Sequence, residues 1–246
     1  SQIEVLQHQN ETLEAIGKAL FKHWFIDFEF PNEQGKPYKS SGGEMIDSEL
    51  GEMPKGWKIK DVYSFADVVN GAPFASNLFN EFGVGLPLIR IRDLKSTTPQ
   101  FYTNEKHPKA TIIQPGDIIA GMDAEFRPTI WTGEKAYLNQ RLFLARPNKD
   151  CIAKFYIYEA LRPHLMFFEN SKVGTTVIHL SKTDIDSFRF PSSTDNLQDK
   201  FKQLVDQIYN KIVVNAQHSR QLSKIRDSLL PKLMSGNIRV PVEVSA

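Results

Sequence analysis

Basic and amide side chains gather at the expected turns in the middle of the sequence. Arg and Lys can neutralise phosphates or pair with guanine edges, while Asn and Gln suit adenine. Contacts with nucleic acid are therefore predicted for Arg90, Arg92, Lys95, Lys106, Lys109, Arg127, Asn139, Gln140, Lys172, Thr175, Thr176 and Lys182. A single charged turn is usually just solvated, so this prediction rests on the group and not on any one member.

Catalytic constellations are few. Gly35-Lys36 is followed by Pro37, so no phosphate-cradling G-x-x-x-x-G-K-[ST] loop is present, and the six histidines lack metal-ligand spacing. Asp117, Asp123 and Glu125 could be the metal carboxylates of a nuclease, but a turn Asp and two loop acids explain them as well. We also find no glycine-rich turn for a methyl donor. The sequence therefore predicts a binding protein, with no metal or cofactor of its own.

A long C-terminal helix is the first element that must position these residues. Between residues 197 and 233 apolar side chains recur at threes and fours. Ser193, Thr194 or Asp195 is expected to cap its start, and Ser235-Gly236-Asn237 its end, unless Pro231 ends it a turn earlier. Such a helix is roughly 50 Å long at about 1.5 Å per residue. It is longer than one domain covers, so it needs a partner helix.

The N-terminal segment supplies a candidate partner, since its apolar residues follow the seam of a coiled coil from Ile3 to Trp24, with Asn10 and Gly17 in the seam. The spacing of Leu13, Ile16 and Leu20 returns in Leu222, Ile225 and Leu229, which is a weak internal repeat. The predicted helix-pairing residues are Leu6, Leu13, Leu20, Trp24, Ile212, Leu222, Ile225 and Leu229. We expect the two terminal helices to pair as an antiparallel coiled coil, with the middle of the chain projecting sideways from this stalk.

The middle of the chain is typical of an α+β domain with short strands. Strands are expected at 58–62, 86–91, 118–120, 129–132, 141–145, 177–180 and 188–190, and a helix at 152–168. The predicted organisation is an N-terminal helix (1–26), an acidic linker with little regular structure (27–52), a mixed domain (53–192), the long helix (193–236) and a tail (237–246).

Charge is unevenly distributed, although the net charge is only +1. Residues 1–52 hold four Lys/Arg against ten Asp/Glu, and residues 53–246 hold twenty-six against nineteen. A polyanion would therefore avoid the linker and prefer residues 53–246. No apolar run is long enough for a membrane span, no signal peptide is recognised, and one cysteine excludes internal disulfides. A cytoplasmic setting is expected.

Several segments resemble DNA-specificity (S) subunits of Type I restriction-modification enzymes. Residues 10–28, which contain FKHWFIDF, are similar to the end of that family's central helical region. SELGEMPKGW at 48–57 looks like the start of a target-recognition domain, and LLPKLMSG at 229–236, with Arg226-Asp227 before it, resembles the tail of the second helical region. Weaker interior landmarks are similar at 116–118, 137–140 and 174–180.

Two departures from the family pattern stand out. Phe188 to Ser193 replaces the proline-rich exit from the recognition domain. A full S subunit also carries two recognition domains and two helical regions, whereas this chain has one domain, one complete helix and the last part of another. Both a half-sized subunit that forms a homodimer and a part of a longer chain remain open.

The resemblance implies a non-catalytic reader of double-stranded DNA. The recognition domain would read one half of a bipartite target, and the helices would set the number of unread base pairs. Methyltransferase (M) and restriction (R) subunits would dock on this frame and carry S-adenosylmethionine, ATP and Mg. Two alternatives are a coiled-coil scaffold that holds another protein without binding DNA, and an autonomous nuclease.

Overall fold

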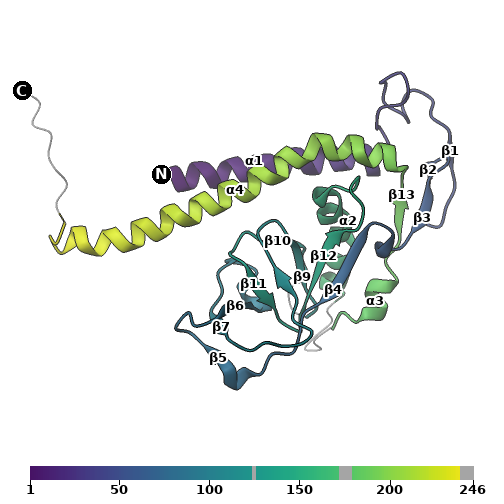
Figure 1. Cartoon of the computed structure of the whole chain (residues 1–246). Helices are drawn as coiled ribbons and strands as arrows, with labels where there is room; N and C mark the ends of the chain where they lie inside the picture. The colour runs from purple at the N-terminus through teal and green to yellow at the C-terminus, as the bar shows by residue number, and fades with distance from the viewer. Residues whose placement is uncertain (124–125, 172–178, 239–246) are drawn as a thin grey trace, which may run out of the picture.

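The computed structural model describes residues 1–123, 126–171 and 179–238. A helical stalk runs along one side of a mixed domain (Figure 1), which is the predicted α+β class. The helices and helical turns are α1 (Gln2–Phe21), the π-helical η1 (Lys22–Ile26), η2 (Val62–Ser64), η3 (Ser76–Leu78), η4 (Ile91–Asp93), α2 (Lys154–Asn170), α3 (Lys182–Asp186) and α4 (Asp195–Met234). The strands are β1 (Met45–Ile46), β2 (Met53–Pro54), β3 (Lys58–Lys60), β4 (Ala66–Asn70), β5 (Phe79–Asn80), β6 (Leu86–Ile89), β7 (Phe101–Thr103), β8 (Ile112–Ile113), β9 (Ile118–Gly121), β10 (Thr129–Ile130), β11 (Ala136–Leu138), β12 (Leu142–Pro147) and β13 (Phe190–Ser192).

The stalk forms because both terminal helices are capped and carry an apolar face. The Ser1 hydroxyl accepts the Glu4 amide at the start of α1, and the Thr194 hydroxyl accepts the Leu197 amide at the start of α4. The α4 helix continues through Pro231, and Gly236 follows it with φ +74°. The predicted long helix and its cap are confirmed.

Pairing of α1 with α4 is antiparallel, as predicted. The Asn10 side-chain amide donates to the Ile212 carbonyl at 2.9 Å, and the Phe21 ring lies 6.5 Å from that of Phe201, so positions rise along one helix as they fall along the other. The pairing residues Leu6, Trp24 and Ile212 are buried, and Leu13 and Leu20 pack against the same core.

The last part of α4, residues 223–234, extends past α1 and does not pair with it, which corrects one part of the prediction; we call these residues the far end of α4. The α4 helix has 40 residues and α1 has 20, and the observed register places the first turn of α1 near Leu222. Beyond it Ile225 and Leu229 are 53% and 40% exposed, and Leu222 is half-buried. Figure 1 shows this end of α4 extending past the start of α1.

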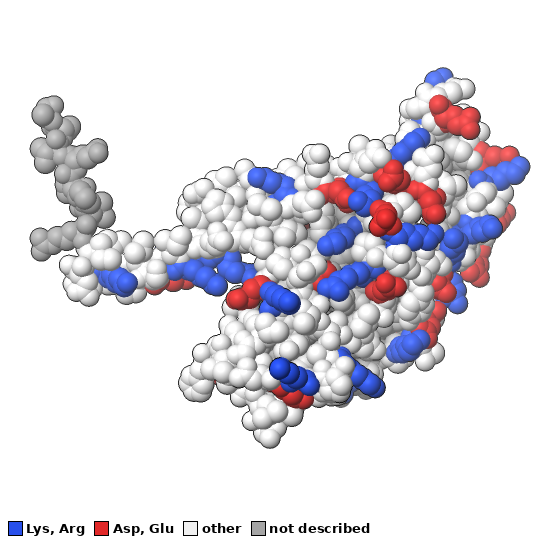
Figure 2. Space-filling model, viewed as in Figure 1, with Lys and Arg blue, Asp and Glu red and all other residues white. Residues whose placement is uncertain are grey.

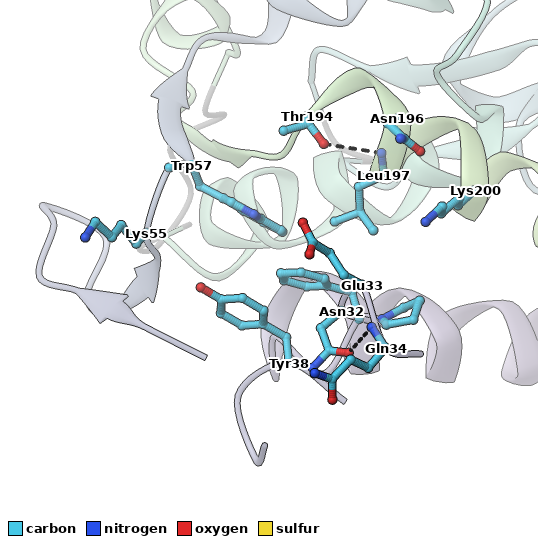
Figure 3. Close-up of a pocket in the computed structure, with 13 residues that line it drawn as sticks. Asn32, Glu33, Gln34, Tyr38, Lys55, Trp57, Thr194, Asn196, Leu197 and Lys200 are labelled. Atoms are coloured by element: carbon cyan, nitrogen blue, oxygen red, sulfur yellow. Dashed lines mark hydrogen bonds between the residues drawn. The ribbon is translucent and has the colours of Figure 1, made fainter. Parts of the chain in front are cut away.

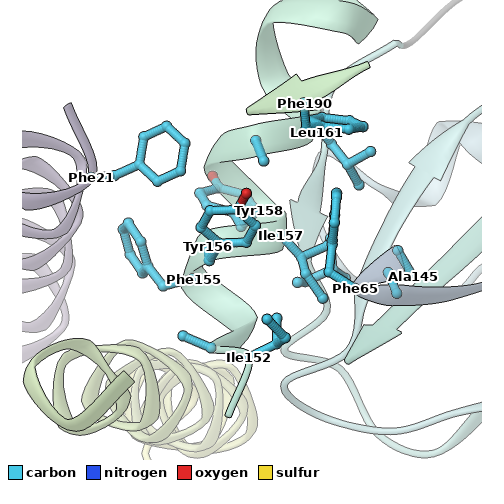
Figure 4. Packing of buried hydrophobic residues seen from close by; sticks show 14 of the residues in the cluster. Phe21, Phe65, Ala145, Ile152, Phe155, Tyr156, Ile157, Tyr158, Leu161 and Phe190 are labelled. Atoms are coloured by element: carbon cyan, nitrogen blue, oxygen red, sulfur yellow. The ribbon is translucent and has the colours of Figure 1, made fainter. Parts of the chain in front are cut away.

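The α2 helix joins the stalk to the mixed domain. Phe155 and Tyr156 face the helix pair, while Ile157 and Leu161 face the sheet and Phe65 (Figure 4). At Gly17 of α1, an added Cβ would lie 2.3 Å from the Phe155 ring, so a residue without a side chain lets the two helices approach. The domain therefore shares one core with the stalk, where a sideways projection from two helices was expected.

Two sheets form the body of the domain. One has the order β10-β9-β12-β4 and the other β5-β7-β6-β11-β8. Side chains of β12 alternate between the sides: Phe143 and Ala145 belong to the core that contains α2, while Leu142 and Leu144 pack into the core between the sheets. The central strands β9 and β12 of the first sheet are therefore buried on both faces.

The segment between α1 and the domain has little regular structure, as predicted, but it is packed against the core. It contains the β1–β2 hairpin, and Phe28 and Phe30 within it are buried. The Phe30 ring stacks on Tyr38 at 4.6 Å and on Trp57 at 5.3 Å. Aromatic burial holds this segment against the core despite its acidic composition.

Six of the predicted strands overlap observed ones, and the predicted helix at 152–168 matches α2. The remaining predicted strand was at 177–180. Residues 177–178 lie outside the described residues, and His179 and Leu180 are not in a strand. The sequence did not predict β4, β7 or β11, which are three to five residues long.

Candidate nucleic-acid interface

A parallel pairing of strands brings two of the predicted polar segments together. Leu88 and Ile89 of β6 lie opposite Tyr137 and Leu138 of β11 in parallel register. The carboxyl ends of these strands therefore meet at one edge of the sheet. The Asn139 amide donates to the Ile89 carbonyl at 3.1 Å. We call Arg90, Arg92, Asn139, Gln140 and Arg141 the polar edge.

Arg90 is a support residue within the polar edge. Its guanidinium lies 3.9 Å above the centre of the Phe101 ring and donates to the Gln100 side chain at 2.9 Å. The buried Asp93 carboxylate accepts the Arg90 amide at 2.9 Å. Burial, and then the charge of Arg92, lower the pKa of Arg90, and burial raises the pKa of Asp93. Arg90 therefore fixes the turn more than it presents a free cation.

Arg92 and Lys95 are exposed, and within the described chain neither side chain makes a hydrogen bond or ion pair. Arg92 lies in η4, directly after the braced Arg90. Gln140 is exposed too, and its backbone N–H donates to the Asn139 side-chain oxygen at 2.6 Å, which leaves the Gln140 side chain unused by this bond. These side chains are free to meet a ligand on a backbone that is already ordered.

The polar edge continues into a cluster that joins distant parts of the sequence. The His179 Nδ1 atom lies 2.7 Å from the Asp123 carboxylate and 3.3 Å from the Arg141 guanidinium. The Leu180 amide donates to the Met122 carbonyl at 2.7 Å and holds this segment in place. No local pattern signals the contact between Asp123 and His179, because the two lie 56 residues apart in the sequence.

The remaining predicted contact residues do not join the polar edge. Arg127 pairs with Glu169 at 3.0 Å, and Lys182 pairs with Asp186 at 2.7 Å on α3. Lys106 and Lys109 are exposed in the loop between β7 and β8. The predicted residues Lys172, Thr175 and Thr176 lie outside the described residues.

Asp117 and Asp123, two of the three acids considered for a nuclease site, make separate contacts. Asp117 is buried, and its two oxygens accept the Arg146 guanidinium at 2.8 and 2.6 Å, while Asp123 contacts His179. Glu125 lies outside the described residues. In the part of the chain that the structure describes, no group of three or more His, Cys, Asp or Glu is placed to hold a metal ion. Nor does any helix there have the length and hydropathy needed to cross a bilayer.

A pocket of about 520 Å³ lies away from the polar edge, where the packed segment after α1 meets the start of α4. Figure 3 shows Trp57 and Tyr38 on one side and Leu197 on the other, with Lys55 and Lys200 near its margins. None of the predicted contact residues lines it. In Figure 2 the charged parts of the visible face mix Lys and Arg with Asp and Glu, whereas the charged side chains on the far end of α4 are mainly Lys and Arg.

The fold defines a class of protein: an α+β domain with an exposed polar edge, packed on an antiparallel helical stalk. Sequence comparison identifies the family within this class. The family model described as the Type I restriction modification DNA specificity domain matches residues 54–224, which is more than half of the chain. The chain belongs to this family.

Relatives of known name agree with the family assignment. The chain is 29% identical to the Type I restriction enzyme EcoBI specificity subunit of Escherichia coli, over 82% of this chain and 44% of that protein. It is 30% identical to the MjaIX specificity subunit of Methanocaldococcus jannaschii, over 97% of this chain and 56% of that protein. The chain thus spans about half the length of the curated relatives it matches.

A solved structure shares the fold. A chain from a structure describing complex assembly and conformational transition of the type I R-M system matches with a TM-score of 0.51 and 18% identity, over 94% of this chain and 54% of that chain. The HsdS subunit from Thermoanaerobacter tengcongensis matches with a TM-score of 0.48 and 18% identity, over 96% of this chain and 54% of that chain.

Proposed function

We propose that this chain reads one half of a bipartite target in double-stranded DNA, as a non-catalytic specificity component of a Type I restriction-modification system. The observation that carries the proposal is the polar edge, where Arg92 and Gln140 extend from two aligned strand ends. An Arg can pair bidentately with guanine, and a Gln with adenine. Loops on a packed sheet can vary without unfolding their support. Family membership supports the same function.

The stalk serves as the spacer and docking frame in this proposal. M subunits would methylate adenine with S-adenosylmethionine, and the R subunit would use ATP and Mg, so this chain needs no cofactor. Ile225 and Leu229 are exposed apolar residues on the same helix at the far end of α4, and such an uncovered apolar face favours a further helical partner. That partner is a second copy in a homodimer or the other half of a longer chain. We also propose that the protein acts in the cytoplasm, where host DNA is accessible.

Sequencing of adenine methylation in the host, with and without this gene, tests the proposal. Loss of one bipartite adenine mark in the deletion strain is expected, and its return on complementation would identify the target. The matched control is a strain that lacks the M subunit gene, which should lose the same mark. An unchanged methylome in the deletion strain, with the mark still lost in the M control, would refute the proposal and favour a scaffold without DNA binding.

A further inference from the structure

Two groups of hydrogen bonds fasten the mixed domain to the middle of α4, in addition to the apolar core that α2 shares with the stalk. In the first, the Tyr209 hydroxyl on α4 and the Lys154 ammonium on α2 both donate to the Gly116 carbonyl, at 3.0 and 2.9 Å. Gly116 has φ +83°, a conformation that suits glycine. Tyr209 also belongs to the apolar core that α2 shares with the stalk, so this first contact is part of that core.

The second group lies eleven residues further along α4, roughly 16 Å at about 1.5 Å per residue. Here the Arg220 guanidinium donates to the Thr97 hydroxyl and, at 3.2 Å, to the Thr132 hydroxyl, and the two hydroxyl oxygens lie 3.1 Å apart. Thr97 has φ +50°, which is unfavourable for a β-branched residue and must be held by its surroundings.

Both threonines belong to loops that are connected to the polar edge or to the first contact. Thr97 follows Arg92 by five residues in the segment after η4. Thr132 follows the buried Trp131, whose carbonyl accepts the Gly116 amide and whose own amide donates to the Asp117 carbonyl, both at 2.7 Å. The chain and its backbone hydrogen bonds therefore link the second contact to the polar edge and to the first contact.

Arg220 holds this position through directional hydrogen bonds. It is half-buried, and burial lowers its pKa. Among the described residues it forms no ion pair with a carboxylate, and the neighbouring ion pair, Lys224 with Glu134, spans 3.9 Å. Two neutral hydroxyls on separate loops therefore define where the planar guanidinium donates.

We propose that Arg220 is a positioning residue that fixes the angle between the recognition domain and α4, and through that angle the spacing at which two half-sites are read. The part that concerns half-sites rests on the proposed function. The part that concerns the angle does not, because Arg220 lies about 16 Å along α4 from Tyr209 and beyond the last α4 residue of the shared core, Val213, where its contact resists a tilt of the domain.

The angle is tested by distance measurement on the whole chain. Nitroxide labels are placed at Lys106→Cys and Lys211→Cys, both exposed, in a Cys151→Ser background. Arg220→Ala and the near-isosteric Thr132→Val are expected to widen the label distance distribution at least twofold. Arg226→Ala, on the same helix but paired only with Asp227 among the described residues, and Thr97→Ser, which keeps the hydroxyl, should leave it unchanged. An unchanged width in both Arg220→Ala and Thr132→Val overturns the proposal.

The spacing is tested in the complex with the M subunits, on duplexes whose half-sites are separated by different numbers of base pairs. Arg220→Ala is expected to lower methylation at the preferred spacing at least threefold and to raise it at spacings one base pair shorter or longer, while Arg226→Ala keeps the native profile. A uniform loss at every spacing overturns the link between angle and spacing. Wider label distances with no methylation by the unaltered complex would instead contradict the proposed function and leave the role of Arg220 in the angle supported.

Discussion

At the residue scale, the polar edge separates a support residue from a presenting one. Arg90 is braced by Phe101, Gln100 and Asp93, whereas the exposed Arg92 has no side-chain partner in the described chain. Arg92→Ala in the complex with M subunits is expected to cost about 1 to 3 kcal/mol of discrimination between the preferred duplex and one with a changed half-site. Binding to both duplexes gives the measurement.

Arg127→Ala is the matched control, because Arg127 already pairs with Glu169 away from the polar edge. It should leave the discrimination as it is. An equal loss for Arg92→Ala on every duplex would reduce Arg92 to a phosphate contact.

A second residue-scale prediction concerns His164, whose ring stacks on Phe188 at 4.7 Å. Burial lowers the pKa of His164, so the folded protein binds a proton less readily than the unfolded chain, where the pKa is about 6.5. The free energy of unfolding should therefore be highest above pH 6.5 and fall as the pH drops towards the lower folded pKa.

Urea unfolding between pH 7.5 and 5 measures this effect. His164→Phe keeps a ring but removes the titrating group, so it should flatten the decline in unfolding free energy. His218→Phe, on an exposed position of α4, controls for the loss of one histidine. The same slope in His164→Phe and the unaltered chain would contradict the assignment.

At the element scale, Gly17 shows packing overruling helix propensity. Gly→Ala inside a helix normally stabilises by about 1 kcal/mol. Here an added methyl would lie 2.3 Å from the Phe155 ring, and overpacking of a core typically costs about 1 to 3 kcal/mol. Gly17→Ala should therefore lower the unfolding free energy measured in urea. Ala19→Gly, on the exposed side of α1, should lower it only by its helix propensity. A stabilised Gly17→Ala chain would show that α1 and α2 are further apart.

The same elements show how far the sequence could predict the fold. Periodicity located both stalk helices and placed Gly17 in the seam, because that pattern is local. It could not show that Phe155 of a third helix fills the space above Gly17, since this contact joins residues distant in the chain. Likewise Arg90 and Asn139 were predicted separately, and only the parallel register of β6 with β11 brought them together. Short strands that were not predicted, such as β4, β7 and β11, are fixed by their neighbours more than by their own pattern.

At the scale of the whole molecule, the unequal lengths of α1 and α4 leave the far end of α4, residues 223–234, without cover from α1. Periodicity alone predicts that truncation of Ile225 and Leu229 loosens the stalk, but both are exposed in the folded chain. The double variant Ile225→Ala, Leu229→Ala should therefore change the unfolding free energy by no more than about 0.5 kcal/mol per site. If these residues meet a second helix, the same variant removes apolar contact from that interface, where each buried CH₂ contributes about 0.8 kcal/mol.

Self-association and assembly with M subunits, both measured by sedimentation velocity, should consequently weaken at least tenfold while stability is retained. The matched control is the double variant Leu204→Ala, Val214→Ala. Both residues are on the part of α4 that pairs with α1, and their side chains are 49% and 55% exposed. This control should leave both assembly and stability as they are. If the Ile225→Ala, Leu229→Ala variant assembles as well as the unaltered chain, the partner does not use these two residues. The spacer would then consist only of the part of α4 that pairs with α1.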